Sequence, residues 1–471
     1  MIRNKPGKSL ILFIILAAAI ALPPSVLVSP YRSDADSGVM RWDTVNTPNS
    51  INNRNDILNP YINNTFTGSE IRDLAVADDG KTLLAAVTVD NRTVAAANNP
   101  GPLGVLYTTA NSGISWTTAA YRVLAGNAAW AADKHVYQVA VAPDDAKIWA
   151  VTAGTRATGP VELWVTINGG AEWNNAGLPA MAAAGEAIGA IDISLDYGTG
   201  RDYAVGTRSG AGNGRLFIMK GQGFNTWMLQ QAPEANIDYF ALKFSPTYNG
   251  DDCIVMVYAD AVRTNYNIGM RDISGNIILS YVFPGTGVEV STTADASPSF
   301  DNLAVADLSL PSDYSGMSPA LRRAFISLYA PFPDAANTTG VFRIDNATPA
   351  AAYSTTVANR QVYSIAFFGT YASGKLLAGF AFGSPCGAMV PTLFMDTPCS
   401  CAGSCGYVSL KPPTGAGNQG NCGSDNITVC SDNLTGVGAA LVAWNPNGSL
   451  AYAATGSGII ADNATWWDSP D

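Results

Sequence analysis

The feature that most constrains the fold of this chain is a repeated unit of two apolar strands joined by a short polar turn. The first copy runs from Ile71 to Thr88, and the second runs from Val136 to Thr152. Further copies begin near Gly189, Tyr239, Asn302, Val362 and Gly438, so successive copies start 65, 53, 50, 63, 60 and 76 residues apart. A period of this length, with space for several short strands per unit, is typical of a β-propeller.

The composition supports this interpretation and excludes several other classes of protein. Of 471 residues, 47% are hydrophobic and only 13% are charged, so the chain can bury a large core and is not a disordered polymer. No segment carries a sustained helical periodicity, which excludes a solenoid of helical repeats. We therefore expect an all-β fold in which residues 39–471 form a single β-propeller with seven four-stranded blades.

A second motif lies in the outer half of the first units. Thr109, Asn111, Gly113 and Trp116 follow the pattern Ser/Thr-x-Asp/Asn-x-Gly-x-x-Trp. The pattern is repeated in the next unit, and its tryptophan recurs in a weaker third copy; these residues are Thr166, Asn168, Gly170, Trp173 and Trp227. In such a hairpin turn the Asn side chain bonds backbone N–H groups, the glycine supplies a positive φ, and the tryptophan packs the outer strand.

This motif resembles the Asp-box, or BNR-like repeat, of sialidases, sortilin-type receptors and photosystem II assembly factor-like propellers. The architecture also looks like that of secreted bacterial surface propellers of the S-layer type. The resemblance covers the repeated part of the chain as an architecture, but the motif itself occurs in only three or four units. The Asp-box is a folding device, so the resemblance implies a structural role for these residues and no activity.

One polar column survives alignment of the inner strands at their turns. Asp192, Lys243 and Asp307 occupy this column in three successive units, where the other units carry Ala75, Ala140, Ala366 and Ala443. Inner strands surround the central channel of a propeller, so we expect these three side chains to approach one another. They form either an ion network between blades, since isolated buried charge is costly, or a site for a polar ligand or ion.

The N-terminus indicates export. Arg3, Lys5 and Lys8 precede an apolar run from Leu10 to Leu22 that contains the small-residue cleavage signal Ala19-Ile-Ala21. This order predicts a secretory signal peptide over residues 1–21. The alternative is an uncleaved anchor that extends to Val28, which is the only membrane attachment that the sequence offers. We accordingly expect a secreted or cell-surface protein.

Cysteine usage fits an exported protein. Six of the seven cysteines lie within an insertion over residues 386–430, namely Cys386, Cys399, Cys401, Cys405, Cys422 and Cys430. We expect three disulfides whose pairing the sequence does not determine. A metal knuckle around Cys399–Cys405 is the competing interpretation, but the spacing lacks the C-x2-C pairs and histidines that metal sites usually use. Cys253 lies in an apolar strand and is expected to be a buried free thiol.

Catalytic motifs are not apparent. The chain has one histidine, His135, which excludes multi-histidine zinc sites and leaves a Ser-His-Asp triad only one base. We expect His135 to be a solvated loop residue. The early Arg-Ile-Pro motif of sialidases does not occur, whereas a glycosidase with two carboxylates is harder to dismiss because the chain is rich in aspartate. We expect no catalytic residue, no cofactor and no bound metal.

The two ends of the chain look complementary. Residues Arg41–Asn46 resemble an outer strand that no inner strand precedes, and the last unit, from Gly438, lacks an outer strand. Pairing the two would turn two open edges into a closed ring. We therefore expect an N-terminal strand to close the last blade. The alternative is that Trp466-Trp467 begins the missing strand, in which case the N-terminal segment adds as an extra edge or lies outside.

These features favour a non-enzymatic structural or binding module of the cell envelope that recognises a protein or glycan partner. A formal net charge of −11 argues against a nucleic-acid partner, which calls for a basic surface. The first alternative is a carbohydrate-active enzyme or lectin-like glycan binder, which would need aromatic platforms and paired carboxylates on one face. The second is an assembly factor for a membrane complex, by resemblance to the photosystem-related propellers, although this acidic chain lacks an obvious arginine cluster.

Overall fold

The computed structural model describes residues 43–45, 70–89, 103–221, 226–271, 279–291, 297–330, 339–355, 360–382, 390–396, 407–408, 432–433, 437–448, 450–456 and 465–470. The chain divides into Met1–Met40 and a second unit, Arg41–Asp471, which holds every described residue. The described part is almost entirely β-structure, with two short helices, α2 (Ala119–Ala125) and α3 (Tyr248–Asp251). None of its helices is long and apolar enough to cross a membrane.

Five sheets are blades built from four consecutive antiparallel strands. The first of these contains β5 (Lys134–Ala142), β6 (Asp145–Thr155), β7 (Glu162–Thr166) and β8 (Asn174–Asn175). The second contains β9 (Ala187–Ile193), β10 (Tyr203–Arg208), β11 (Leu216–Met219) and β12 (Trp227–Leu229). The third contains β13 (Asp238–Phe244), β14 (Cys253–Ala259), β15 (Thr264–Arg271) and β16 (Leu279–Tyr281), with β17 (Val288–Glu289) added on β15.

The other two of these five blades follow in chain order. One contains β18 (Val305–Ser309), β19 (Arg323–Tyr329), β20 (Thr339–Asp345) and β21 (Thr348–Thr355). The other contains β22 (Arg360–Phe368), β23 (Lys375–Phe382), β24 (Val390–Asp396) and β25 (Tyr407–Val408), with β26 (Asp432–Asn433) added on β24. Strands β24 and β25 both lie within the cysteine-rich insertion over residues 386–430, so part of it belongs to the blade. The six cysteines lie outside the described residues, so the expected disulfides stay a prediction.

Two further sheets depart from this pattern. One has three strands, β2 (Glu70–Val76), β3 (Leu83–Val89) and β4 (Leu103–Thr109), with α2 following β4. The other combines strands from both ends of the chain, β27 (Val437–Trp444), β28 (Leu450–Gly456), β29 (Thr465–Pro470) and β1 (Asp43–Val45). The expectation of seven four-stranded blades in sequence is therefore wrong: the described chain has five such blades, because the segment after β4 forms a helix and the last sheet has only three consecutive strands of its own.

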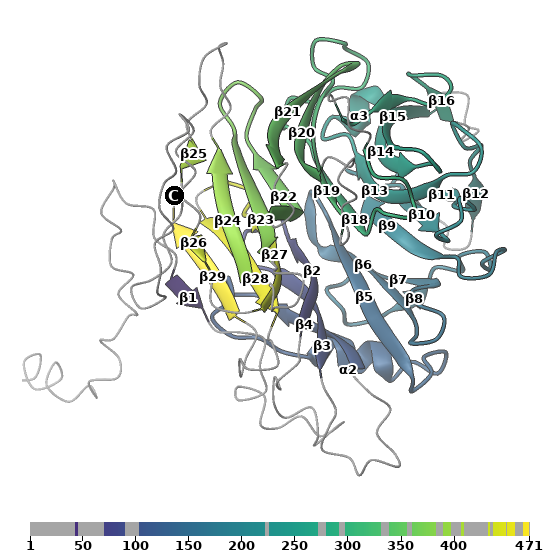
Figure 1. Ribbon diagram of the computed structural model, residues 1–471. Coiled ribbons are helices and arrows are strands. Elements are labelled where there is room, and N and C mark those ends of the chain that lie inside the picture. The colour runs from purple at the N-terminus through teal and green to yellow at the C-terminus, as the bar shows by residue number, and fades with distance from the viewer. Residues whose placement is uncertain are drawn as a thin grey trace, which may run out of the picture. The chain divides into compact units, whose positions relative to one another are not determined.

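The sheets are arranged side by side around a central axis, which makes the fold an all-β β-propeller (Figure 1). The innermost strand of each sheet contacts the innermost strand of the next, in the order β2, β5, β9, β13, β18, β22 and β27, and β27 contacts β2 again. Each of these strands is an edge of its own sheet, so its free backbone groups face the axis or the neighbouring sheet.

The ring closes through the N-terminal strand. In β1, Thr44 pairs with Trp467 of β29, and β29 in turn pairs with β28. The third strand of this sheet is therefore Thr465–Pro470, and the N-terminal strand supplies the fourth. Figure 1 shows β1, at the purple end of the chain, beside the yellow β29. The expected pairing of the two ends is present, and it covers the open edge that β29 would otherwise present.

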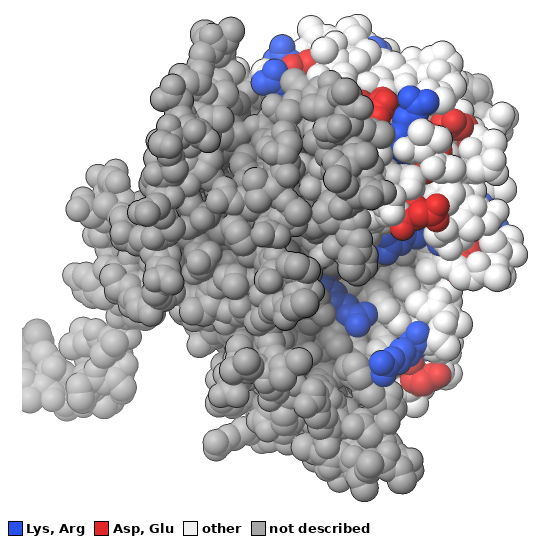
Figure 2. All heavy atoms as spheres, viewed as in Figure 1, with Lys and Arg blue, Asp and Glu red and all other residues white. Residues whose placement is uncertain are grey.

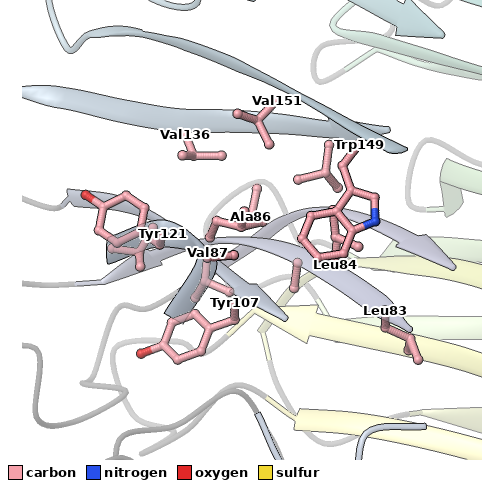
Figure 3. Packing of buried hydrophobic residues seen from close by; sticks show 14 of the residues in the cluster. Leu83, Leu84, Ala86, Val87, Tyr107, Tyr121, Val136, Trp149 and Val151 are labelled. Atoms are coloured by element: carbon pink, nitrogen blue, oxygen red, sulfur yellow. The ribbon is translucent and has the colours of Figure 1, made fainter. Parts of the chain in front are cut away.

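The core lies between adjacent sheets. In the largest cluster, Leu84 and Val87 of β3 pack with Val136 of β5 and Val151 of β6, and Tyr121 of α2 belongs to the same cluster (Figure 3). Strand β14 has every residue buried, which fits a central strand covered on both faces. Burial of each large apolar side chain contributes roughly 1.5–3 kcal/mol, so these clusters between sheets hold the ring together.

Candidate functional site

A cavity of about 500 Å³ lies on the axis of the propeller. Residues of all seven inner strands line it, so no single sheet forms the site. Its size falls within the usual range of small-molecule sites. On one outer face, by contrast, the described basic and acidic side chains are interspersed among uncharged ones (Figure 2).

All three residues of the predicted polar column line this cavity. Lys243 Nζ lies 3.2 Å from Asp192 Oδ1, an ion pair that joins β13 to β9. The Lys243 side chain is 46% exposed into the cavity, whereas that of Asp192 is 12% exposed. Asp307 of β18 also attracts the Lys243 ammonium group. The structure thus places these three side chains in one electrostatic network.

A fourth acidic residue, Asp73 of β2, belongs to the same network. Alignment of the units at their turns placed Ala75 in the polar column, and the equivalent bulges of β2, β5, β9, β13 and β22 agree with that alignment. Asp73 lies two residues before that column, directly after the bulge between Ile71 and Asp73, so an alignment of that column does not include it. The signal that would have found Asp73 is a lone aspartate inside an apolar inner strand, a pattern that β2, β9 and β18 share.

Asp73, Asp192 and Asp307 have the same structural relationship to the next sheet. Each uses Oδ2 to accept a backbone N–H from the adjacent inner strand, donated by Val139 at 2.8 Å, Phe244 at 2.7 Å and Ile365 at 2.8 Å, respectively. The Oδ1 atoms accept from the backbone N–H of Leu74, the ammonium group of Lys243 and the backbone N–H of Leu308, respectively. All six carboxylate oxygens therefore already have a partner within the protein.

Burial governs the ionisation of these groups. Desolvation raises the pKa of Asp73 to about 7, although the backbone bonds from Val139 and Leu74 oppose the shift. Desolvation also raises the pKa of Asp192 and of Asp307. The attraction of Asp192 raises the pKa of Lys243, so the ammonium group stays charged at neutral pH.

Two arginines complete the charged lining of the cavity. Arg72 of β2 lies with Cζ 5.3 Å from the ring centroid of Tyr137. Arg208, at the end of β10, places Cζ 5.2 Å from the ring centroid of Phe240 and donates from Nη1 to the Ala304 carbonyl at 2.7 Å. Arg72 is the extra residue of the β2 bulge, and Arg208 is the last residue of β10. Neither belongs to a repeated column, so the sequence did not single them out.

The two better copies of the turn motif have nearly identical geometry. Asn111 Oδ1 accepts from Thr109 Oγ1 at 2.8 Å and from the Ser115 backbone N–H at 2.9 Å. In the second copy, Asn168 Oδ1 accepts from Thr166 Oγ1 and from the Glu172 backbone N–H, both at 2.9 Å. The glycines that require a positive φ are Gly113 at 84° and Gly170 at 82°. These residues stabilise turns on the outer side of the blades and do not line the cavity.

The motif tryptophans tie neighbouring sheets together. Trp116 and Trp173 are buried, at 2% and 4% exposure. Trp173 Nε1 donates to the Ala120 carbonyl of α2 at 3.1 Å, and Trp227 Nε1 donates to the Ala176 carbonyl at 2.7 Å. Both acceptors lie just after the outer part of the preceding sheet. The weak third copy therefore keeps the tryptophan contact, although the rest of its turn pattern is lost.

The expectation for His135 was wrong. It lies within β5 and is only 8% exposed, so it is not a solvated loop residue. Its Nδ1 accepts the Gly104 backbone N–H at 2.9 Å, across the boundary between two sheets. Burial lowers its pKa, and the charges of Arg72 and Arg156 lower it further. The prediction for Cys253 is confirmed, since it is a buried free thiol in β14.

Metal-binding geometry is not seen in the described ranges, where no group of three or more His, Cys, Asp or Glu side chains is placed to hold a metal ion. Comparison with known proteins adds little: no family model matches the chain, and no curated protein matches it. Membership of the Asp-box family therefore stays a prediction.

Solved structures give only distant likenesses. A protein of unknown function from Dyadobacter fermentans has 11% identity and a TM-score of 0.40, over 91% of this chain and 99% of that chain. A subtype N11 neuraminidase-like protein of A/flat-faced bat/Peru/033/2010 has 8% identity and a TM-score of 0.39, over 70% of this chain and 87% of that chain. A prolyl endopeptidase has 10% identity and a TM-score of 0.40, over 83% of this chain and 46% of that chain. We draw no conclusion about activity from likenesses at this level.

Proposed function

We propose that this chain is an exported, non-enzymatic binding propeller of the cell envelope, with the axial cavity as its ligand site. The observation that carries the proposal is the pairing of all six oxygens of Asp73, Asp192 and Asp307 within the protein. A carboxylate that acts as nucleophile or general acid needs an oxygen directed at substrate. These carboxylates instead organise the cavity wall.

The only histidine supports the same conclusion. His135 Nδ1 is occupied by the Gly104 N–H, and a neutral imidazole with an acceptor Nδ1 carries its proton on Nε2. Its pKa is lowered by burial, which is compatible with a base, but the residue does not line the cavity. A binding role uses the cavity as it is and needs no reacting group.

Export is the part of the proposal that rests on sequence alone. The basic, apolar and small-residue segments of residues 1–21 are those of a secretory signal. The low content of charged residues and the cysteine-rich insertion agree with an extracytoplasmic location.

Two measurements on the full chain test the proposal. Fractionation with a C-terminal tag and protease treatment of intact cells should find the protein outside the cytoplasm. Purified protein should bind one or more compounds from a small-molecule and glycan library, and it should leave chromogenic glycosides, esters and peptides unhydrolysed. Turnover of any of these substrates would overturn the non-enzymatic role, and turnover of a glycoside that is lost in Asp192→Asn would favour the carbohydrate-active alternative. A cytoplasmic protein would overturn the envelope role.

A further inference from the structure

The free hydrogen-bonding capacity of the axial cavity lies on its cations. Lys243 has three N–H donors, and one of them reaches Asp192 Oδ1 at 3.2 Å. Arg208 has five donors, of which Nη1 bonds the Ala304 carbonyl. Among the residues that the structure describes, the Arg72 guanidinium has an aromatic neighbour, Tyr137, but no protein acceptor. Several charged donors therefore face the cavity without an acceptor from the protein.

The anionic side chains of the cavity show the opposite situation. Both oxygens of Asp73 accept backbone N–H groups, and the same residue has a pKa raised by burial to about 7. Asp307 accepts three bonds, from the Leu308 N–H, the Ile365 N–H and Ser364 Oγ. Each of these oxygens already accepts at least one bond from the protein, whereas an anionic ligand would use donors that have no partner in the described part of the chain.

The balance of charge points the same way. Arg72, Arg208 and Lys243 supply three positive charges, and Asp73, Asp192 and Asp307 supply at most three negative charges. Burial raises the pKa of Asp73 to about 7, which favours its neutral form and reduces the negative charge that opposes the three cations. The enclosing walls focus the charge of these cations on the space between the strands.

We propose that the axial cavity binds a small oxyanion, a carboxylate or phosphate compound, through Arg72, Lys243 and Arg208. This inference rests on the proposed function and names the class of ligand for its binding site. The two guanidinium groups supply planar pairs of donors that match carboxylate or phosphate oxygens, and Lys243 supplies a point charge. A volume of about 500 Å³ admits a compound larger than a free ion.

The test is calorimetric titration of the full chain at constant ionic strength with three probes: succinate, inorganic phosphate and the diamine putrescine. We expect succinate or phosphate to bind at one site and putrescine not to bind. Arg72→Gln should weaken the binding at least tenfold, and Arg72→Lys, which keeps the charge but loses the fork, should weaken it less. Lys147→Met, at an exposed position outside the cavity, is the matched control and should bind like the wild type.

Lys243→Met is a second variant, and a thermal melt shows whether it still folds, since it leaves Asp192 without its ion-pair partner. Arg72 makes no ion pair within the described structure, so Arg72→Gln tests the proposal even if Lys243→Met fails to fold. Failure of both oxyanions to bind the wild type, or equal affinity in Arg72→Gln, overturns the oxyanion site. If the oxyanions fail but putrescine or a neutral library compound binds, the proposed binding function stands without the oxyanion site. If no compound binds at all, both the binding function and the oxyanion site are overturned.

Discussion

Asp192 of β9 accepts a hydrogen bond from the backbone N–H of Phe244, in the next inner strand, with Oδ2 and N 2.7 Å apart. The same relationship joins Asp73 to Val139 and Asp307 to Ile365. An inner strand is the edge of its sheet, so part of its backbone lacks a ladder partner. The three aspartates supply that partner from the neighbouring sheet, so their carboxylates are hydrogen-bonded between the sheets.

The first prediction concerns this bond between sheets. Asp307→Ala removes the acceptor for the Ile365 N–H and for Ser364 Oγ, and a buried donor left unpaired costs about 1–3 kcal/mol. We expect urea denaturation to show a loss of that size, with a smaller loss in Asp307→Asn, which keeps an acceptor oxygen. Asp301→Ala is the matched control, because Asp301 is exposed in the segment before β18. Equal stability of Asp307→Ala and the control would contradict the role.

The second prediction is a pH dependence that originates at Asp73. Burial raises its pKa from 3.8 to about 7, so between these values the folded state binds the proton more tightly than the unfolded chain. The contribution of Asp73 to stability therefore falls as the pH rises from about 4 to about 7, by at most roughly 1.4 kcal/mol per pH unit. In Asp73→Asn the stability should decline less between pH 5 and pH 8.

Charges from several strands face Asp73, and they set the size of the effect. Asp307 raises its pKa, Lys243 lowers it, and Arg72 and Asp192 line the same cavity. Melting curves of the wild type and of Asp73→Asn at pH 5 and pH 8 test the prediction. Asp133→Asn is the control at an exposed position. Parallel pH profiles for the wild type and Asp73→Asn would show that Asp73 titrates normally.

The sequence predicted the features that depend on local chemistry. The turns at Asn111 and Asn168 follow from residue types at fixed spacing, since a short polar side chain and a glycine define such a turn without help from the rest of the chain. The ion pair of Asp192 and Lys243 followed from the repeat, because equivalent positions of inner strands face one axis, and Asp307 lines the same cavity. The pairing of the two chain ends followed from the missing outer strand of the last unit.

The sequence failed where tertiary context decides. Asp73 lies two residues before the aligned column, directly after the bulge between Ile71 and Asp73, and only the contacts between sheets show that it faces the same cavity. The segment after β4 pairs with it only through the bridge between Thr108 and Thr117 and then continues into α2, whose Ala120 carbonyl accepts a hydrogen bond from Trp173 of the next sheet. His135 precedes an apolar run in the sequence, but its side chain is buried and accepts the backbone N–H of Gly104, a residue 31 positions away.

The third prediction concerns the structural role of Asn168 in its turn. Asn168→Asp keeps an oxygen that accepts from Thr166 Oγ1 and from the Glu172 N–H, so it should fold with nearly unchanged stability. Asn168→Ala loses both bonds and should cost about 0.5–2 kcal/mol, as for the loss of a comparable capping side chain. Denaturation of both variants measures the difference. A loss of similar size in both would mean that the amide nitrogen, and not the oxygen, matters at this turn.

The fourth prediction concerns ring closure by β1. Deletion of residues 41–46 exposes β29 as an open strand edge, since Thr44 pairs with Trp467 in the intact chain. We expect a lower melting temperature and aggregation that increases with protein concentration. Deletion of residues 31–38, which leaves the paired strand in place, is the control. A melting curve and light scattering like those of the full chain would show that β1 contributes nothing to closure.

The last prediction uses the fact that His135 is the only histidine of the chain, so its imidazole signals need no assignment. Its Nδ1 accepts the Gly104 N–H, which requires the tautomer with the proton on Nε2. Burial first, and then the charges of Arg72 and Arg156, lower its pKa below 6.5. The unfolded chain thus binds the proton more readily, and the contribution of His135 to stability is lost as the pH falls below 6.5, opposite in sign to that of Asp73. Nitrogen-15 NMR of histidine-labelled protein should show an unprotonated Nδ1 at pH 7 and a midpoint below 6.5. A protonated Nδ1 at pH 7, or a midpoint at or above 6.5, would contradict the buried hydrogen bond. The control is the same spectrum of His135→Gln, which should contain no imidazole signals.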